Sequence, residues 1–478
     1  MSEIKKDFGD WLSPMLVKEI RQGFRSRIFV FAFLLIQGLM IFCVVLGLIF
    51  SSGDFTEGSS WVFWTIICIP LLLIMPSHGF GVLGNEIKGN TIELLFLTRL
   101  SAWRIVVGKW TAIVAQTILI ICSVLPYAVL RYFIGGVNLL TDLEALGWLL
   151  FASALLTGVT IAISPFYRSM LAKLFLPVLT LFLLWMLAAF LEGVSLRHAS
   201  MTNTFLITAV LGPLFLLLMF EIAVARIAPP AENHSFRKRL LGFLILGAIA
   251  LLDMVTADPV PLMAASFVLL LPVCVTALCE EIKPIPSIYL PFVKRGYFGR
   301  LAGLLFYPGW PSGFLFTIFA FVAYLAIFMP RKMTVDEDGL LMIISMGGAI
   351  LMPLAVEKLF FERLKKTFVV YFALQAFMGL SVFLAAAVKP TSLSDWMKLA
   401  SPFPTTVFIL MSSNSIDAAD KPLFTLIGAL VLIVSLVILL VKSSRDRGKI
   451  AVYENIARDT LMNREAPVVA EVPDANAA

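Results

Sequence analysis

The sequence has little charge, little cysteine and little histidine. Only 14% of its 478 residues are charged, five are cysteine and three are histidine. A soluble globular domain has about 25% charged residues. The histidines are dispersed at His78, His198 and His234, so no metal site is expected. The cysteines show neither a disulfide pattern nor a metal-finger spacing, and they lie in or beside apolar runs, which is typical of small buried side chains: Cys43, Cys68, Cys122, Cys274 and Cys279.

Two further signals are missing. The N-terminal stretch MSEIKKDFGDW has no short apolar core followed by a small-residue cleavage site, so we expect no cleaved signal peptide. No nucleophile and base stand in a recognisable catalytic arrangement either. The sequence therefore does not predict an enzyme.

Long apolar runs are what the sequence has in excess, since 60% of its residues are hydrophobic. A run of about 20 apolar residues spans the hydrocarbon core of a bilayer as a helix. Backbone polar groups must be paired within lipid, which leaves only helices and closed barrels. Barrel strands alternate apolar and polar residues, and these runs do not alternate. The sequence predicts an all-α polytopic membrane protein.

Twelve candidate spans can be placed along the chain. The seventh runs almost directly into the eighth, and the ninth is long and broken by Pro308 and Pro311. The spans are 28–50, 61–83, 110–133, 145–164, 171–191, 204–226, 239–257, 259–279, 301–329, 339–357, 367–388 and 423–442.

The orientation follows from the basic residues of alternate loops. If every span crosses the membrane, the segments on one side carry 30 Lys and Arg residues and those on the other side carry 7. Cytoplasmic loops are enriched in Lys and Arg. The distribution therefore predicts that both termini are cytoplasmic. It also explains the net charge of +6 as a property of topology, without nucleic acid as a partner.

A proline-rich linker at 228–238 divides the predicted spans into two six-helix halves, 28–227 and 239–442. A weak internal echo supports the division, because Glu86-Ile87-Lys88 and Glu281-Ile282-Lys283 follow equivalent spans. Duplication of this kind is common in transporters. The remaining segments are residues 1–27 and a cytoplasmic tail, 443–478, that we expect to be partly disordered.

Residues 11–27 predict an amphipathic helix before the first span. Ser13 and Pro14 suit the N-cap and the first helical position. Apolar side chains recur on one face, and the other face carries charge from Lys18, Glu19, Arg21 and Arg25. Such a helix lies in the membrane interface. It is either a generic anchor or an elbow helix docked beside a cytoplasmic partner.

The loop 84–109 is too long for a tight turn between two spans. Asn90 or Thr91 can cap a short helix within it, and Ser101 can cap a second helix that continues as the third span. The loop combines charges with an apolar face that lipid alone would not require. Such a helix suits a soluble partner, because apolar side chains fill a groove and charges fix the register.

These segments resemble the type-2 permeases of ATP-binding-cassette (ABC) transporters. The matching stretches are Asn90-Thr91-Ile92-Glu93-Leu94-Leu95 after Glu86, then Thr98-Arg99-Leu100-Ser101, Ile105-Val106-Val107-Gly108-Lys109, and the N-terminal Pro14-Met15-Leu16-Val17-Lys18-Glu19-Ile20-Arg21. Asn90 stands where the family usually has glycine, and Arg99 where it usually has proline. The resemblance covers roughly residues 11–230, and the second half matches only in span count and loop placement.

The resemblance implies a transmembrane permease subunit, with an exporter as the expected type, in the bacterial inner membrane. Its partner would be an ATP-binding-cassette ATPase subunit that holds ATP and magnesium. Gly108-Lys109 is followed by Trp110, so this chain has no phosphate-binding Gly-x4-Gly-Lys-Ser/Thr motif. We expect no cofactor on the chain itself. The implied coupling residues are Glu86, Lys88, Thr91, Glu93, Leu95, Arg99, Arg104 and Lys109.

Other functions remain open at this stage. An ion-gradient-driven transporter also fits two six-span halves, but it needs charged or polar residues at mid-bilayer, and the sequence supplies few. A membrane scaffold is a further alternative. The chain is either a complete fused permease or one that pairs with a second permease or a second copy. The connection 389–422 is either a re-entrant helix pair or an interfacial loop.

Overall fold

The structure is a computed structural model of the full chain. It describes residues 14–49, 63–89, 100–134, 138–168, 201–256, 259–328, 337–364, 367–387, 403, 404, 407 and 420–465. These residues form helices and their connections, with no strand among them. They belong to two compact units, Met1–Ala228 and Pro229–Ala478, and the boundary between them in the sequence falls at the start of the predicted linker.

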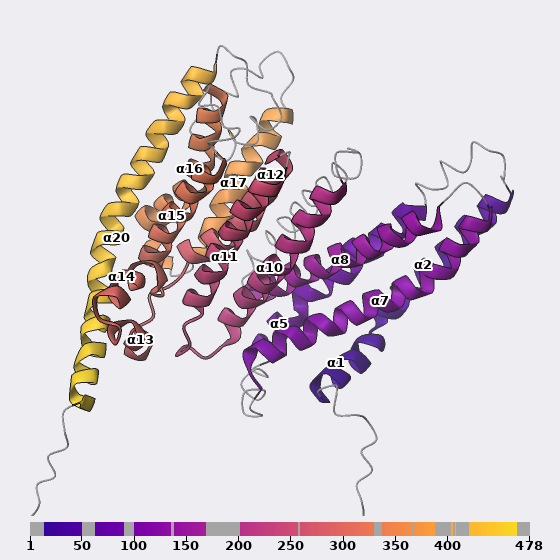
Figure 1. The fold of residues 1–478 in the computed structure, drawn as a ribbon, viewed down its shortest axis with the longest axis horizontal. Helices are drawn as coiled ribbons and strands as arrows, with labels where there is room; N and C mark the ends of the chain where they lie inside the picture. Colours follow the sequence, from indigo (N-terminus) through magenta and orange to yellow (C-terminus); the bar gives the residue numbers. More distant parts are fainter. Residues whose placement is uncertain are drawn as a thin grey trace, which may run out of the picture. The chain divides into compact units, whose positions relative to one another are not determined.

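The described residues of the first unit are helical apart from their short connections (Figure 1). The segment Phe63–Lys88 is one long apolar stretch that includes a π-helical turn. The elements are α1 (Pro14–Phe24), α2 (Arg27–Ile49), η1 (Ile69–Ile74), α4 (Met75–Ser77), α5 (Gly79–Lys88), α7 (Ala102–Ile134), α8 (Leu139–Ile163), η2 (Ser164–Arg168) and α10 (Met201–Ile227).

Local sequence signals set several of these helix ends. α1 begins at Pro14, as predicted. The Ser101 side chain accepts a hydrogen bond from the Arg104 amide at 3.4 Å, so the predicted cap of the third span is confirmed. Asn138 caps α8 by accepting from the Leu140 amide at 3.0 Å. One continuous helix, α7, therefore carries both the end of the loop 84–109 and the third predicted span.

Two apolar clusters hold the first unit together. One lies among α1, α2, η1, α7 and α8 and includes Ile36, Met40 and Leu71. The other joins α5, α7, α8 and α10 and includes Ile105 and Phe220. The second cluster contains residues from both helices that join the loop 84–109, Leu83 of α5 and Ile105 of α7, so it supports the candidate site described below.

The second unit is also helical throughout its described residues. Its elements are α11 (His234–Val255), α12 (Pro259–Leu278), η3 (Pro286–Ile288), α13 (Leu290–Val293), α14 (Gly296–Phe306), α15 (Trp310–Phe328), α16 (Glu337–Val356), η4 (Glu357–Phe361), η5 (Glu362–Leu364), α17 (Thr367–Ala387) and α20 (Lys421–Glu465).

The predicted break in the ninth span is confirmed. α14 ends at Phe306 and α15 begins at Trp310, so Pro308 lies in the connection. Gly309 in this connection has a φ of 131°, a backbone conformation that other residues rarely adopt. The turn exposes backbone carbonyls that a neighbouring arginine uses, as described below.

Seven described helical stretches are long and apolar enough to cross a membrane, and an eighth is counted if α1 and α2 form one bent span. Every predicted span except 171–191, which lies outside the described residues, overlaps helical residues, and the ninth, 301–329, is divided between α14 and α15. Three of those helices, α11, α12 and α17, are not among the seven stretches, and α2 is counted only together with α1. The chain is a multi-pass membrane protein, while the arrangement of twelve spans in two halves with cytoplasmic ends stays a prediction.

Large apolar side chains are exposed on the surface of the helices, as expected for helices surrounded by lipid. On α2, Phe31, Leu34 and Phe42 are each at least 60% exposed. Soluble monomers rarely expose contiguous apolar surface of this kind. A bilayer gives these side chains an apolar solvent.

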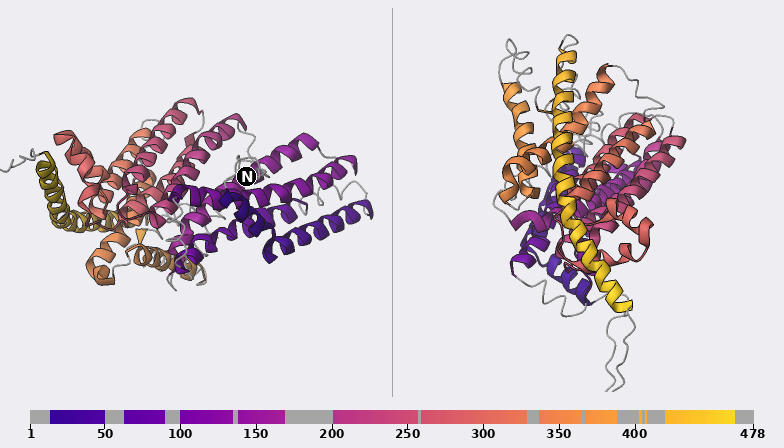
Figure 2. Two further views of the ribbon diagram at one scale, coloured as in Figure 1. Left: turned by 90° about the horizontal axis from the view of Figure 1, so that it is seen from below. Right: turned by 90° about the vertical axis from the view of Figure 1, so that its left-hand side faces the viewer.

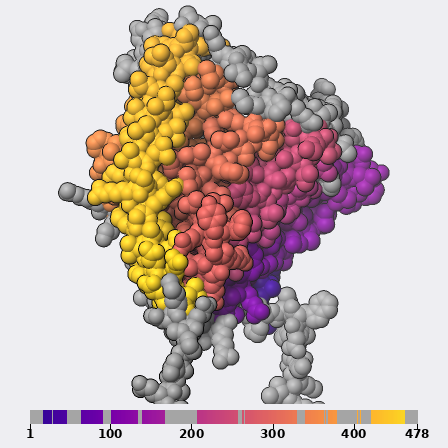
Figure 3. Space-filling model, turned by 60° about the vertical axis from the view of Figure 1, so that its left-hand side comes forward, coloured from indigo at the N-terminus to yellow at the C-terminus, as the bar shows by residue number. Residues whose placement is uncertain are grey.

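The last helix is much longer than the predicted span 423–442. α20 continues without interruption to Glu465, so residues 443–465 of the predicted tail are helical and only 466–478 lie outside the described residues. Figure 2 shows α20 as one continuous helix that curves in the left view, and Figure 3 shows it lying along the surface of its unit. Contacts with the η3–α14 region hold its second half, because Tyr453 stacks on Tyr289 and Glu454 pairs with Arg300 at 2.8 Å.

Candidate functional site

Three helices of the first unit bring charged side chains together where the two ends of the loop 84–109 meet α1. Glu19 comes from α1, Glu86 from α5 and Lys109 from α7. The Lys109 ammonium lies 2.6 Å from Glu86 Oε1 and 3.3 Å from Glu19 Oε1. We call this arrangement the Lys109 junction. All three residues belong to the set that the sequence predicts for the elbow helix and the coupling loop.

The Lys109 junction is shielded from solvent. The Lys109 side chain is 5% exposed, and the two carboxylates are about one-fifth exposed, at 20% for Glu19 and 21% for Glu86. A buried ammonium needs a partner, because its desolvation costs several kcal/mol. Two carboxylates supply that compensation, so Lys109 holds α1 and α5 to α7.

α1 packs closely on α7 next to this junction. A Cβ on Gly23 would overlap the side-chain amide of Gln116, so Gly23 leaves room for this side chain of α7 against α1. Phe24 joins the apolar cluster beside α2, with its ring centroid 5.5 Å from that of Phe29. The predicted elbow helix is therefore seated on the helical bundle of its unit by packing as well as by charge.

α5 is tied in turn to the end of α8. The Ser164 hydroxyl accepts from the amides of Leu83 and Gly84, at 3.0 Å each, and donates to the Phe80 carbonyl at 2.8 Å. A Cβ on Gly79 would overlap Thr160 of α8. These contacts join the segment that precedes the loop 84–109 rigidly to α8.

α7 makes comparable contacts with α8 and α10. The Trp110 indole donates to the Ala154 carbonyl at 2.9 Å. The rings of Trp103 and Trp110 both meet Phe220 of α10 edge-on, at centroid distances of 5.9 and 5.3 Å. A displacement of the loop ends would therefore reach α1, α7, α8 and α10.

The structure brings together only part of the predicted coupling set. Lys88 and Arg104 lie within the loop 84–109 and are exposed, and neither is one of the three residues of the Lys109 junction. Lys18 and Arg21 are exposed on α1, Arg25 is exposed directly after it, and the three line one groove. Thr91, Glu93, Leu95 and Arg99 lie outside the described residues.

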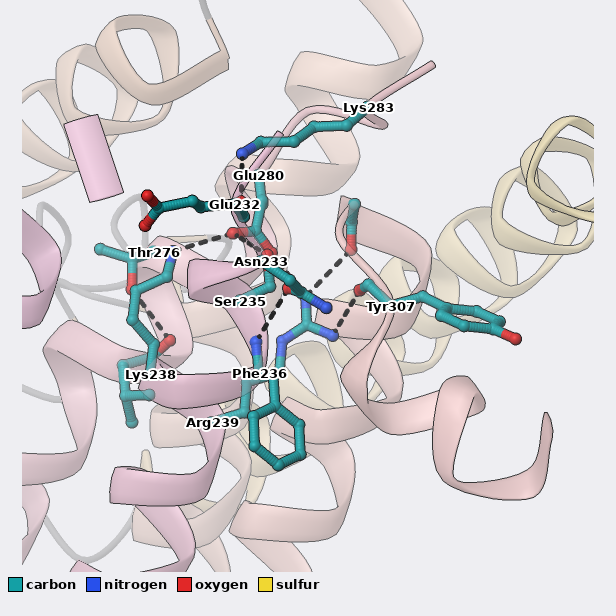
Figure 4. A network of polar contacts seen from close by, with 12 residues as sticks. Glu232, Asn233, Ser235, Phe236, Lys238, Arg239, Thr276, Glu280, Lys283 and Tyr307 are labelled. Atoms are coloured by element: carbon teal, nitrogen blue, oxygen red, sulfur yellow. Dashed lines mark hydrogen bonds and ion pairs between the residues drawn. The ribbon is translucent and has the colours of Figure 1, made fainter. Parts of the chain in front are cut away.

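A second charged cluster, in the second unit, is absent from the sequence-based predictions. Glu280, just after α12, accepts from Ser235 at 2.7 Å, from Lys238 at 2.8 Å and from Arg239 at 2.7 Å (Figure 4). Arg239, 1% exposed, also donates to the carbonyls of Leu305, Tyr307 and Gly309, which belong to the α14–α15 turn. The cluster joins α11, the end of α12 and the start of α15.

Burial raises the pKa of the Glu280 carboxyl, but the charges of Lys238 and Arg239 and the hydrogen bonds from Lys238 and Ser235 outweigh it. The pKa falls to about 2. Glu280 is therefore ionised at neutral pH and acts as a structural anchor. A sequence signal existed, since Arg239 and Glu280 lie at the ends of consecutive spans, but only the fold shows that they meet.

The described residues contain no group of three or more His, Cys, Asp or Glu side chains that could hold a metal ion. The charged clusters found here are paired cations and carboxylates. They can fix helix ends and transmit movement.

Comparison of the chain with models of protein families, with curated proteins and with solved structures finds no match. The resemblance of residues 11–230 to type-2 ABC permeases therefore stays a prediction.

Proposed function

We propose that this chain is the transmembrane permease subunit of an ABC transporter, operating as an exporter. The observation that carries the proposal is the Lys109 junction. It joins the elbow helix to both ends of the loop 84–109, and these are the segments that carry the resemblance. The long apolar helices fit the same role.

In this proposal the loop 84–109 is the contact for a separate ATPase subunit. The residues that contact the partner are Thr91, Glu93, Leu95 and Arg99. Glu86 and Lys109, paired at the two ends of the loop, pass its movement to the helices. Movement of α5 passes through Lys109 to α1 and α7 and through Ser164 to α8. The bundle responds as a unit, because packed helices rearrange between discrete states and do not deform continuously.

The energy source lies in the partner. The sequence has no phosphate-binding Gly-x4-Gly-Lys-Ser/Thr motif, so ATP and magnesium are bound by the ATPase subunit. The proposed location is the bacterial inner membrane, with the junction on the cytoplasmic side. The 30-to-7 distribution of basic residues supports that orientation.

The test is purification of the tagged chain from its native membrane in mild detergent. We expect a protein with a nucleotide-binding motif to copurify and its ATPase activity to depend on the permease. Glu93→Lys should remove most of the copurified ATPase, since it reverses a charge in the proposed contact. Glu144→Lys is the matched control, because Glu144 is exposed at the start of α8, on the predicted opposite side.

Two results would contradict the proposal. One is that no ATP-binding protein copurifies. The other is that Glu93→Lys and Glu144→Lys leave the same amount of partner. Substrate uptake driven by an ion gradient into vesicles without ATP would favour a secondary transporter instead.

A further inference from the structure

A groove with a volume of about 680 Å³ runs along α1. Three of its described lining residues are cationic and none is acidic. The lining residues are Val17, Lys18, Arg21, Gln22, Arg25 and Ser26. Binding sites for small ligands have volumes of ~300–1,000 Å³, so the groove has room for a charged headgroup.

The carboxylate of α1 is not among the described residues that line this groove. Glu19 is the only acidic residue between Pro14 and Phe24. It faces α7, where it pairs with Lys109 at 3.3 Å. The Lys109 junction therefore separates the charges of α1, with the anion held inside the unit and the cations on the exposed face.

The groove lies where the apolar surface of α2 begins. The segments Leu16–Phe24 and Phe29–Val45 are bent by 56° relative to each other. Val30, Phe31 and Leu34 follow within two to three turns of Arg25 and are 44%, 68% and 63% exposed. Arg25 lies in the break between α1 and α2, six residues before Phe31. In a bilayer that surrounds the exposed apolar side chains of α2, these cations would lie near the headgroups.

We propose that the groove on α1 binds the phosphate of an anionic phospholipid headgroup, with Lys18, Arg21 and Arg25 as its ligands. Guanidinium groups suit this role because they form paired hydrogen bonds with phosphate oxygens. A lipid fits better than an acidic protein, since the exposed apolar side chains of α2, from Val30 onward, follow the groove within a few residues and offer acyl chains an apolar surface. The site does not depend on the proposed transport function.

The experiment places the full chain in nanodiscs of phosphatidylcholine containing phosphatidylglycerol and measures lipids retained after transfer to detergent by native mass spectrometry. Wild-type protein should retain phosphatidylglycerol in preference to phosphatidylcholine. A cation near an anionic surface contributes ~1 kcal/mol, which is about fivefold in affinity. Lys18→Gln/Arg21→Gln/Arg25→Gln should therefore lose the preference, and Arg25→Gln alone should weaken it about fivefold.

The matched control is Arg237→Gln/Lys294→Gln/Arg295→Gln, which removes the same charge from exposed positions of the second unit. It should retain phosphatidylglycerol like the wild type. Millimolar inorganic phosphate should not displace the lipid; displacement would identify a site for a soluble anion. Retention that is unchanged in the triple α1 variant, or lost equally in the control, would also overturn the proposal. Should the triple variant fail to fold, Arg25→Gln alone decides between these outcomes.

Discussion

Lys109→Met removes the ammonium from the Lys109 junction and keeps most of the side chain's apolar volume. At an effective dielectric constant of about 20, the Coulomb attraction is roughly 6 kcal/mol for the 2.6 Å pair and roughly 5 kcal/mol for the 3.3 Å pair. Desolvation of the ammonium offsets most of this. Removal of one partner of a buried pair typically costs about 3–5 kcal/mol.

The two carboxylates left behind are about one-fifth exposed, so water compensates part of the loss. We therefore expect Lys109→Met to lower the free energy of unfolding by about 2–3 kcal/mol. The assay is unfolding in detergent micelles. Arg104→Gln is the control, because Arg104 lies on the same helix but is exposed, and its substitution should change stability by at most about 0.5 kcal/mol.

A second measurement separates the ion pair from general damage to α7. A double-mutant cycle of Lys109→Met with Glu86→Gln should show a coupling energy of about 1–3 kcal/mol. Limited proteolysis should also cut α1 sooner in Lys109→Met than in Arg104→Gln. If both variants unfold alike, or if the cycle gives no coupling, the junction does not hold the helices as argued.

Three further predictions concern the second unit. Folding lowers the pKa of Glu280 to about 2, so its ionised carboxylate contributes fully to the free energy of unfolding above about pH 4.5, and this contribution is lost as the pH falls towards 2. The free energy of unfolding should fall by about 3 kcal/mol over this range, and Glu280→Gln should remove most of this pH dependence. Gly313→Ala should destabilise by about 1–3 kcal/mol, since its Cβ would overlap the backbone of α12, whereas Gly247→Ala, with open space around it, should be neutral or stabilising in the same unfolding assay. Tyr453→Ala should cost about 1–2 kcal/mol and speed proteolysis of the end of α20, because it removes a stacked ring, and the exposed neighbour Val452→Ala should do neither.

The candidate site was only partly predictable from the sequence. The positions of Glu19, Glu86 and Lys109 followed from an amphipathic segment and a charged loop, which are local patterns. Their meeting at one ammonium depends on how α1, α5 and α7 cross, and no local pattern encodes that. The Glu280 cluster was harder still to predict, because Arg239 donates to three backbone carbonyls at the α14–α15 connection. Every residue has a backbone carbonyl, so the sequence does not indicate which ones an arginine will reach.

The length of α20 could not be read from hydropathy. The polar residues after Lys442 end the apolar run, so the predicted span stops there. A polar segment still continues as a helix when a neighbour covers one face. Here Ile450 and Ala457 face the cluster formed by η3, α13 and Tyr307, and Gly448 costs only about 1 kcal/mol in a helix.

The unbroken course of α20 makes it a lever. Residues 443–465 extend roughly 34 Å beyond the predicted span at 1.5 Å per residue. A tilt of only about 10° in the membrane portion would displace the far end by roughly 6 Å. No proline interrupts the helix after Pro422, and the residues are helical from Lys421 to Glu465. A small change in the angle of the last span would therefore produce a larger displacement at the far end of α20, where Tyr289 and Arg300 contact it.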